Sequence, residues 1–319
     1  MKTLVPDYYR DFRCKADMCR HSCCVGWEID VDSDAEKMYG KVGDDTDFGR
    51  KLGKSISHDG TPHFILTEDE RCPFLTKSGL CEIYINLGEN ALCEICTEHP
   101  RFRSFFSDRV EIGLGMCCEE AARIVLSKRC GLRLVPLCED GCESNPDDGE
   151  RDFFALREDL FGILAERETC ADKKLDSVMK CVGVHFPERK TSEWRDIFAD
   201  LEILDSEWEQ RLSVLSDEIP FGKLPQIEGD CCDFYSNLAE YLLFRHLADG
   251  FFSDSLREYV LFAVLGTRLV GALCEQERRR CGELLFDTAA DIARMFSSEI
   301  EYDEDNVERL IGILGEMQE

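Results

Sequence analysis

The chain has 319 residues, 19 of them cysteine, and carries a formal net charge of −28 at pH 7. Its length fits one large domain or two ordinary ones, and a hydrophobic content of 44% excludes a disordered, solvating chain. The acidic charge argues against a nucleic acid or a membrane surface as a partner, because the phosphate groups of both would repel it.

The N-terminal residues MKTLVPDYYRDF lack the apolar core and the small-residue cleavage site of a secretory signal. The longest apolar run, from Val260 to Cys274, is interrupted by Arg268 and is shorter than the roughly 20 residues that a membrane-spanning helix needs. We therefore expect a cytoplasmic protein. Because thiols stay reduced in that compartment, a metal or cluster site explains the cysteine content better than disulfides do.

Charge and cysteines are unevenly distributed along the chain. Residues 1–130 have a net charge of −5 and hold 11 cysteines, whereas residues 131–319 have a net charge of −23. Residues 139–152, EDGCESNPDDGERD, are polar and rich in turn-forming residues, as linkers are. These features predict a cysteine-rich metal or iron–sulfur domain over residues 1–138 and an acidic α-helical domain over residues 150–319.

The first domain is predicted to be irregular, with a few short strands. Turn signals interrupt it repeatedly, and the apolar segments 63–66 and 109–114 have the length of strands. The segment that starts at Cys118, CEEAARIVLSKRC, has the apolar spacing of a helix. A chain interrupted so often buries little apolar surface, and a bound metal could supply the missing stability.

The second domain is predicted to be a bundle of six or seven helices, which makes the whole chain mainly α. Apolar residues recur with a helical period from Phe153 to Leu164 and from Trp194 to Trp208. The same pattern predicts further helices over residues 232–249, 254–275, 281–299 and 305–317.

Ten cysteines are concentrated in the first domain and are the candidate metal ligands. They are Cys14, Cys19, Cys23, Cys24, Cys72, Cys81, Cys93, Cys96, Cys117 and Cys118. A zinc or iron–sulfur centre needs roughly four thiolates, and a C-x2-C pair such as Cys93 and Cys96 directs two of them at one ion. Ten thiols can supply two centres, or one centre and several packing residues. The spacing alone does not choose between zinc and iron.

Two motifs beside these cysteines allow more than one interpretation. The segment VEIGLGMC (110–117) partly matches the glycine turn of Rossmann-type methyltransferases, but Cys117 replaces the third glycine, and we favour a short strand that delivers Cys117 and Cys118 to the metal site. His99 can be a metal ligand, a hydrogen-bond partner of a sulfur, or structural. Arg101 can neutralise a cluster, hold the carboxylate of a cofactor, or form a surface ion pair.

The cysteine framework resembles known proteins. The pattern C-x3-CC (19–24), followed by CPFL (72–75), GLCEIY (79–84) and CTEHPRF (96–102), is similar to the YkgJ-type zinc- or iron-chelating cysteine domain. The wider pattern resembles the flagellin lysine-N-methylase (FliB) family over about residues 8–125. It adds FRC (12–14), Trp27 in CC-x2-W, ICTEHPR (95–101) and MCCEEAARI (116–124).

This resemblance implies a protein-lysine N-methyltransferase that transfers a methyl group from S-adenosylmethionine to lysines of flagellin and carries a [4Fe–4S] cluster. The ligands are then expected among the ten thiols, with Cys19, Cys23, Cys24, Cys72, Cys81 and Cys96 as first choices. His99 and Arg101 are expected to bind the cofactor. Gly26 stands where the radical motif C-x3-C-x2-C has its third cysteine, which leaves radical and polar methyl transfer open. The alternative is a non-enzymatic zinc- or iron-binding protein that acts as a scaffold or chelator.

Overall fold

The chain folds into two compact units. The computed structural model describes residues 2–129, 131–139, 145–229 and 233–318. The helical unit consists of Met1–Phe12 and Phe102–Glu319, and the cysteine unit consists of Arg13–Arg101. Each unit is described by itself.

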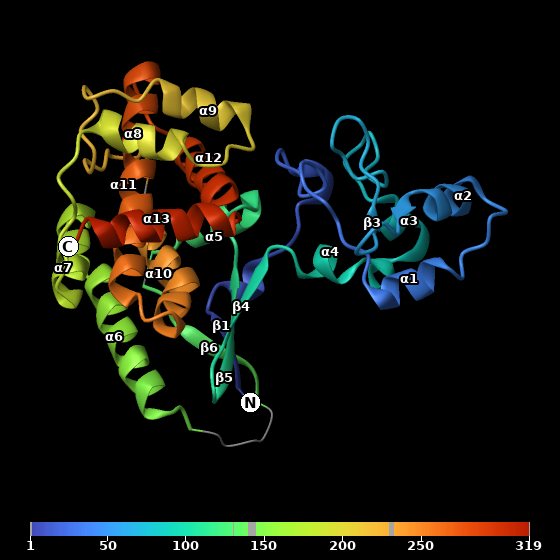
Figure 1. Cartoon of the computed structure of the whole chain (residues 1–319), viewed down its shortest axis with the longest axis horizontal. Helices are drawn as coiled ribbons and strands as arrows, with labels where there is room; N and C mark the ends of the chain where they lie inside the picture. The colour runs from blue at the N-terminus through green and yellow to red at the C-terminus, as the bar shows by residue number, and fades with distance from the viewer. Residues whose placement is uncertain (1, 130, 140–144, 230–232, 319) are drawn as a thin grey trace. The chain divides into compact units, whose positions relative to one another are not determined.

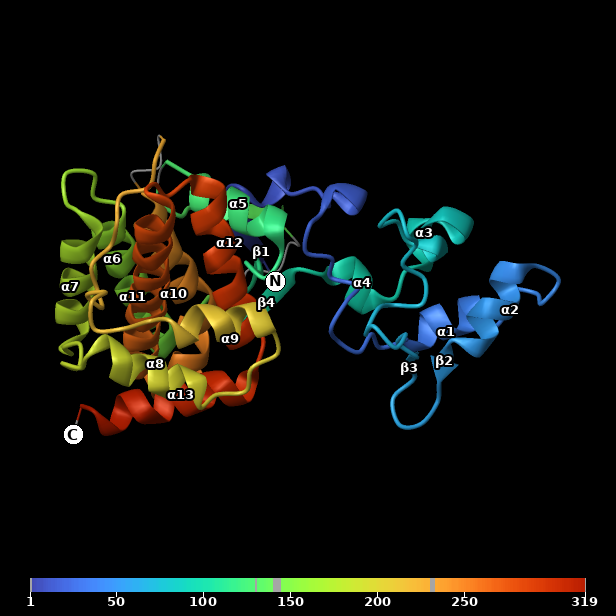
Figure 2. The same ribbon diagram turned by 90° about the horizontal axis from the view of Figure 1, so that it is seen from above.

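Nine α-helices in the described residues build most of the helical unit (Figures 1 and 2). They are α5 (Glu119–Ser127), α6 (Asp148–Leu164), α7 (Ala171–Val182), α8 (Thr191–Ala199), α9 (Ser206–Ser213), α10 (Phe234–Phe252), α11 (Leu256–Cys281), α12 (Phe286–Phe296) and α13 (Glu304–Glu316). The helices α10 and α11 are buried along most of their length and pack against each other. The predicted mainly helical fold is confirmed.

A small sheet completes the helical unit, with strand order β4-β5-β1-β6. Its strands are β1 (Lys2–Pro6), β4 (Arg101–Phe105), β5 (Arg109–Leu114) and β6 (Leu134–Glu139). Strand β1 runs parallel to β5 and antiparallel to β6. The last four residues of β5 are buried, and the chain turns directly from its end into α5.

The two units divide the chain at other positions than the predicted domains 1–138 and 150–319. Residues 102–138, which we expected in the cysteine-rich domain, belong to the helical unit. The physical reason is that β5 and α5 bury their apolar residues in the core that the helices share. Low net charge and clustered cysteines therefore did not mark the folding boundary.

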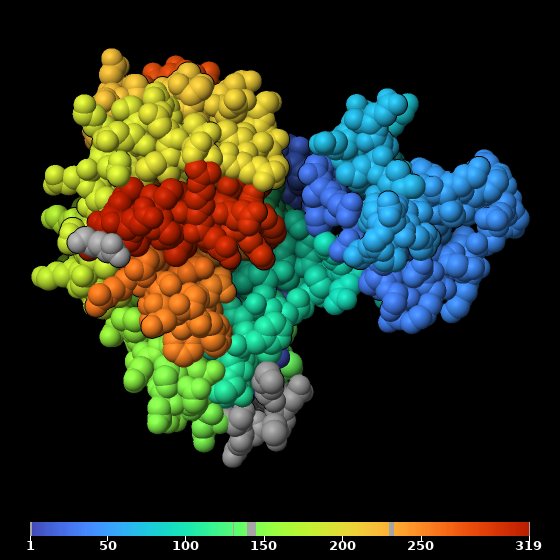
Figure 3. All heavy atoms as spheres, in the orientation of Figure 1, coloured from blue at the N-terminus to red at the C-terminus, as the bar shows by residue number. Residues whose placement is uncertain are grey.

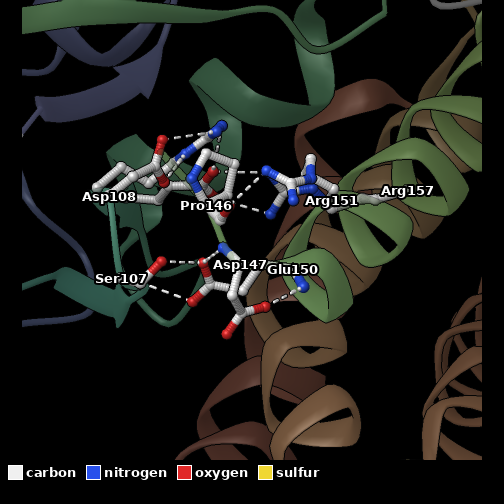
Figure 4. Close-up of polar contacts among 9 residues, drawn as sticks. Ser107, Asp108, Pro146, Asp147, Glu150, Arg151 and Arg157 are labelled. Carbon is white, nitrogen blue, oxygen red and sulfur yellow. Dashed lines mark hydrogen bonds and ion pairs between the residues drawn. The ribbon is translucent and has the colours of Figure 1, made fainter. Parts of the chain in front are cut away.

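Contacts at the start of α6 show how closely this segment is tied to the helices (Figure 4). The backbone N–H of Ser107 donates to Oε1 of Glu150 at 2.7 Å, and the Ser107 hydroxyl bonds to the same carboxylate. Asp147 caps the helix by accepting from the backbone N–H of Glu150 at 2.7 Å. The linker predicted at 139–152 thus runs into α6, and residues 140–144 of it lie outside the described residues.

The predicted helices are confirmed for α6, α10, α11, α12 and α13, with ends that differ from the predicted ones by up to six residues. The apolar stripe from Trp194 to Trp208 is interrupted and forms the two helices α8 and α9. Asp205 begins α9 by accepting from the N–H of Glu207 at 2.8 Å, and Asn306 of α13 accepts from the N–H of Glu202 at 3.0 Å. Helix α7 was not predicted, and together with the division into α8 and α9 it gives eight helices, α6 to α13, in the described residues rather than six or seven.

The surface of the helical unit carries α13, which lies beside α8 and α9 in Figure 3. Arg309 of α13 donates to the backbone carbonyl of Asp200 at 2.6 Å. The longest helix, α11, is largely buried but carries Arg268 near its middle. No helix among the described residues is long and apolar enough to span a membrane.

The cysteine unit is built from short elements around a small core. Its elements are η2 (Ala16–Met18), α1 (Ser33–Tyr39), α2 (Asp47–Lys54), β2 (Ile56–Ser57), β3 (His63–Phe64), α3 (Glu82–Leu87), η3 (Glu89–Ala91) and α4 (Glu94–Glu98). Strands β2 and β3 pair antiparallel, and Phe64 contacts Phe74 edge to face at 5.0 Å between ring centroids. The core contains cysteines as well as these apolar side chains.

Candidate thiol site

Five of the ten candidate thiols come together in the core of the cysteine unit. They are Cys24, Cys72, Cys81, Cys93 and Cys96. Cys72 and Cys93 are buried, and the other three are half-buried. The thiols are close enough for the charge of one to shift the pKa of another. The pKa of Cys72 responds to Cys24, Cys81 and Cys93, and the pKa of Cys96 responds to Cys24, Cys72 and Cys93. Three stretches of sequence thus supply one group of sulfur atoms.

Backbone hydrogen bonds connect the loops that carry these thiols. The N–H of Cys72 donates to the carbonyl of Cys24 at 2.8 Å, and Leu75 forms an isolated β-bridge with Cys81. The N–H of Glu94, at the start of α4, donates to the carboxylate of Asp32 at 2.7 Å. This contact holds the C-x2-C segment against the start of α1, which Asp32 also caps.

Tyr39 is a further residue of this site that the sequence did not indicate. Its hydroxyl lies 2.7 Å from the carbonyl of Ala91, to which it donates, and 3.4 Å from Sγ of Cys93. The residue is buried at the end of α1. No spacing rule relates a tyrosine at position 39 to a cysteine at position 93, so only the fold brings the two together.

The five thiols differ in how readily they ionise. A hydrogen bond from Cys23 is the main reason that the pKa of Cys24 falls to about 7, although burial opposes it. The hydrogen bond between Cys93 and Cys96 lowers the pKa of Cys93, and the same bond together with burial raises the pKa of Cys96. Burial raises the pKa of Cys72 to about 12. Without a bound metal only part of the group ionises, whereas metal binding would favour the thiolate form of all five.

The donor set suits a soft metal, but its atoms do not form a finished ligand shell. Across the described residues, no group of three or more Cys, His, Asp or Glu side chains is positioned to hold a metal ion. Five thiols exceed the roughly four that zinc or an iron–sulfur cluster takes, so the residue types and their number fit such a group. Binding would require the loops to bring the sulfurs closer together.

Three other candidate thiols of the cysteine unit lie outside this core group. Cys14 and Cys23 are exposed, and Cys19 is half-buried. The thiol of Cys19 donates to the carbonyl of His21 at 3.2 Å, and Sγ of Cys14 accepts from the N–H of Ala16 at 3.4 Å. Cys23 adjoins the group through its hydrogen bond to Cys24.

Cys117 and Cys118 belong to the helical unit. We expected a short strand to deliver them to the metal site. The strand, β5, leads into them and Cys118 immediately precedes α5, but neither thiol belongs to the core group of the cysteine unit. The thiol of Cys117 is hydrogen-bonded to Tyr302 and lies near the guanidinium of Arg245, and burial raises its pKa to about 12. The structure thus assigns these two thiols to a different compact unit from the other eight.

The glycine motif that precedes Cys117 is explained by packing. A Cβ atom at Gly113 would collide with the ring of Phe102, and one at Gly115 with the hydroxyl of Tyr302. Glu111 is buried and accepts two hydrogen bonds from Arg157, at 2.6 and 2.7 Å. The three motif residues are therefore used for close packing and charge pairing inside the helical unit.

His99 and Arg101 lie at the end of the cysteine unit. The ring of His99 is half-buried, 6.2 Å from the ring of Trp27, and burial together with the charge of Arg101 lowers its pKa to about 4. The imidazole is consequently neutral near pH 7 and retains a lone pair. Arg101 donates from Nη1 to the carbonyl of Thr97 at 3.0 Å, which holds it beside α4.

Comparison with known proteins returned no match to the chain among family models, curated proteins or solved structures.

Proposed function

We propose that the cysteine unit binds a metal centre through the thiolates of Cys24, Cys72, Cys81, Cys93 and Cys96, with a [4Fe–4S] cluster as the first choice and zinc as the alternative. The observation that carries this proposal is the gathering of five thiols from three chain segments in one small core. Independent packing roles would not require cysteines from separate segments to meet. A metal also explains how a unit of such short elements becomes stable, because metal binding adds directly to folding free energy.

The residues around the thiols have distinct tasks in this proposal. Asp32 and the backbone bond between Cys72 and Cys24 hold the three segments in register. Tyr39 can orient Cys93. A bound cluster would supply a positively charged iron that stabilises thiolates and can accept oxygen or nitrogen donors.

We further propose that the protein is a cytoplasmic S-adenosylmethionine-dependent protein-lysine N-methyltransferase that acts on flagellin. The support is the sequence resemblance across residues 8–125. In this reaction the lysine amine attacks the sulfonium methyl group, which leaves S-adenosylhomocysteine and releases a proton. Arg101 could hold the carboxylate of the methyl donor by a paired hydrogen bond, and neutral His99 could accept a proton or a hydrogen bond. The acidic helical unit would attract a lysine-bearing surface.

The second candidate function is a non-enzymatic scaffold or chelator that binds zinc or iron. Its specific support is the burial of Cys72 and Cys93, because structural metal sites are closed by protein ligands whereas catalytic sites keep an open position.

The first experiment is anaerobic purification of the full chain, followed by metal analysis and a visible spectrum. Stoichiometric iron, acid-labile sulfide and visible absorption would support the cluster, and colourless protein with stoichiometric zinc would support the alternative. Cys96→Ser should lose most of the metal, whereas Cys181→Ser, an exposed thiol on α7, is the matched control and should retain it. Protein without either metal, or equal loss in both variants, would overturn the proposed centre.

The second experiment tests the reaction itself. Iron-loaded protein, S-adenosylmethionine and flagellin are incubated anaerobically, and flagellin is analysed by peptide mass spectrometry. Addition of methyl groups to lysine, with S-adenosylhomocysteine as co-product, would support polar methyl transfer, and 5′-deoxyadenosine would indicate a radical route. If flagellin stays unmethylated with fully iron-loaded protein, the methyltransferase proposal is refuted and the non-enzymatic scaffold or chelator is favoured.

A further inference from the structure

The one charged residue inside the longest apolar run of the chain lies beside a pocket of the helical unit. Arg268 interrupts the run from Val260 to Cys274 in α11, where most neighbours are fully buried. The pocket has a volume of about 570 Å³, within the range of small-molecule sites. Its lining consists of Phe186, Pro187, Glu188, Arg189, Lys190, Glu193, Phe221 and Arg268.

One wall of this pocket is aromatic. The rings of Phe186 and Phe221 are stacked, with centroids 6.1 Å apart and planes 19° from parallel. The buried Trp194 stacks on Phe221 and makes a tilted contact with Phe186. Such a wall offers a rigid surface to a flat apolar ring.

The guanidinium of Arg268 has unused hydrogen-bonding capacity. It lies over the ring of Phe186 at 4.1 Å, and among the described residues its only hydrogen bond runs from Nη2 to Asp176 at 3.2 Å. Nε is buried and makes no hydrogen bond to any residue that the structure describes. A guanidinium has several N–H donors that match the oxygens of a carboxylate or phosphate, and buried donors are normally satisfied.

The charge at the pocket differs from that of its surroundings. The lining holds three cations, Arg189, Lys190 and Arg268, and two carboxylates, Glu188 and Glu193, and Asp176 pairs with Arg268, so cations and carboxylates are about balanced. Residues 131–319, to which it belongs, have a net charge of −23. Arg189 is 3.7 Å from Glu193, a distance at which a ligand anion can compete for the cation.

We propose that this pocket binds a small molecule that joins a flat ring to an anionic group, either phosphate or carboxylate. The ring lies against Phe186 and Phe221, and the anion meets Arg268 with help from Arg189 and Lys190. The proposal does not depend on the thiol site or on methyl transfer.

The test is isothermal titration calorimetry of the full chain with four probes at low salt. Adenosine 5′-monophosphate and 1-naphthoate each carry a ring and an anion, whereas adenosine lacks the anion and inorganic phosphate lacks the ring. We expect saturable binding of at least one of the first two, weakened about tenfold or more when either part is missing. Which of the two binds decides between phosphate and carboxylate.

Three variants locate the binding site. Arg268→Gln should weaken binding about tenfold, and the exposed pair Arg189→Gln/Lys190→Gln severalfold, because each removes a charge-assisted contact. Arg257→Gln, an exposed arginine at the start of the same helix, is the matched control and should bind as the original chain does. If Arg268→Gln does not fold, the affinity of the Arg189→Gln/Lys190→Gln variant is the deciding measurement.

Three results would overturn the proposal. The first is that neither anionic ring compound binds saturably below about 5 mM. The second is that adenosine and its monophosphate bind equally well. The third is that Arg257→Gln loses as much affinity as the pocket variants do.

Discussion

The buried pair of Glu111 and Arg157 permits a quantitative test of the helical unit. The two side chains are 1% and 5% exposed and share two hydrogen bonds of 2.6 and 2.7 Å. The guanidinium also lies among aromatic rings, with Phe153 and Phe154 each at 5.3 Å. Glu111→Gln would leave a buried positive charge without its counter-charge, although the amide carbonyl would still accept one hydrogen bond. We expect unfolding free energy to fall by about 3 kcal/mol, the range for breaking a buried pair.

The assay is urea denaturation followed by tryptophan fluorescence. Trp194 and Trp208 are buried in the helical unit and report its unfolding. The matched control is Glu207→Gln, which removes a 56% exposed partner of Arg211 on α9 and should cost less than about 1 kcal/mol. In the double variant Glu111→Leu/Arg157→Met, most of the loss should return, because apolar residues of similar volume replace both charges.

The reasoning would be refuted by a loss below about 1 kcal/mol in Glu111→Gln, or by no recovery in the double variant. The first result would mean that water compensates for the missing charge, because Arg109, whose Nη1 lies 3.9 Å from Oε1 of Glu111, is a second cation and would only add repulsion. The same measurement also tests the motif at 110–117, since a glutamate used only for cofactor binding would leave stability unchanged.

Three further outcomes follow from the structure. Gly115→Ala should lower the melting temperature because its Cβ meets the Tyr302 hydroxyl, and Tyr302→Phe should restore part of the loss; equal melting of Gly115→Ala and the original chain would contradict this. Burial opposes ionisation of Glu301, but the hydrogen bond from His246 and the charge of Arg245 bring its pKa below 4.5. The ionised carboxylate therefore stabilises the fold above pH 4.5, and this stabilisation is lost as the pH falls through the lower pKa of the folded state. The gap in melting temperature between the original chain and Glu301→Gln should therefore narrow below about pH 4, and a constant gap from pH 6 to 3 would argue against it. Removal of metal by a chelator should increase hydrogen exchange in peptides of residues 13–101, and an even increase along the chain would contradict separate units.

The sequence alone was sufficient for the long amphipathic helices. In α6 and α13 the apolar residues recur with a helical period, and Asp303 caps the first turn of α13, whereas the cap of α6, Asp147, lies in the segment that we predicted as a linker. These signals are local, so they can be recognised without knowing which other helices pack against the segment. The break between α8 and α9 was missed because Asn306, about a hundred residues away, binds the backbone of the intervening loop.

The domain boundary shows a different limit of sequence reasoning. Composition changes sharply near residue 139, but the chain folds according to which apolar surfaces can be buried together. Strand β5 and α5 share the core of α10 and α12, and this places residues 102–138 with the helices despite their cysteines. Burial is a property of contacts between distant segments, and composition does not record those contacts.

The cysteine pattern identified thiol chemistry, while the tertiary structure decided which thiols meet. Spacing treated ten cysteines as one set, whereas the fold groups Cys24, Cys72, Cys81, Cys93 and Cys96 in one core and assigns Cys117 and Cys118 to the helical unit. Tyr39 and Asp32 enter that site only through packing, because their partners lie more than 50 residues away. Local spacing specifies residue types and turns, but a shared site depends on long-range contacts that only the folded chain creates.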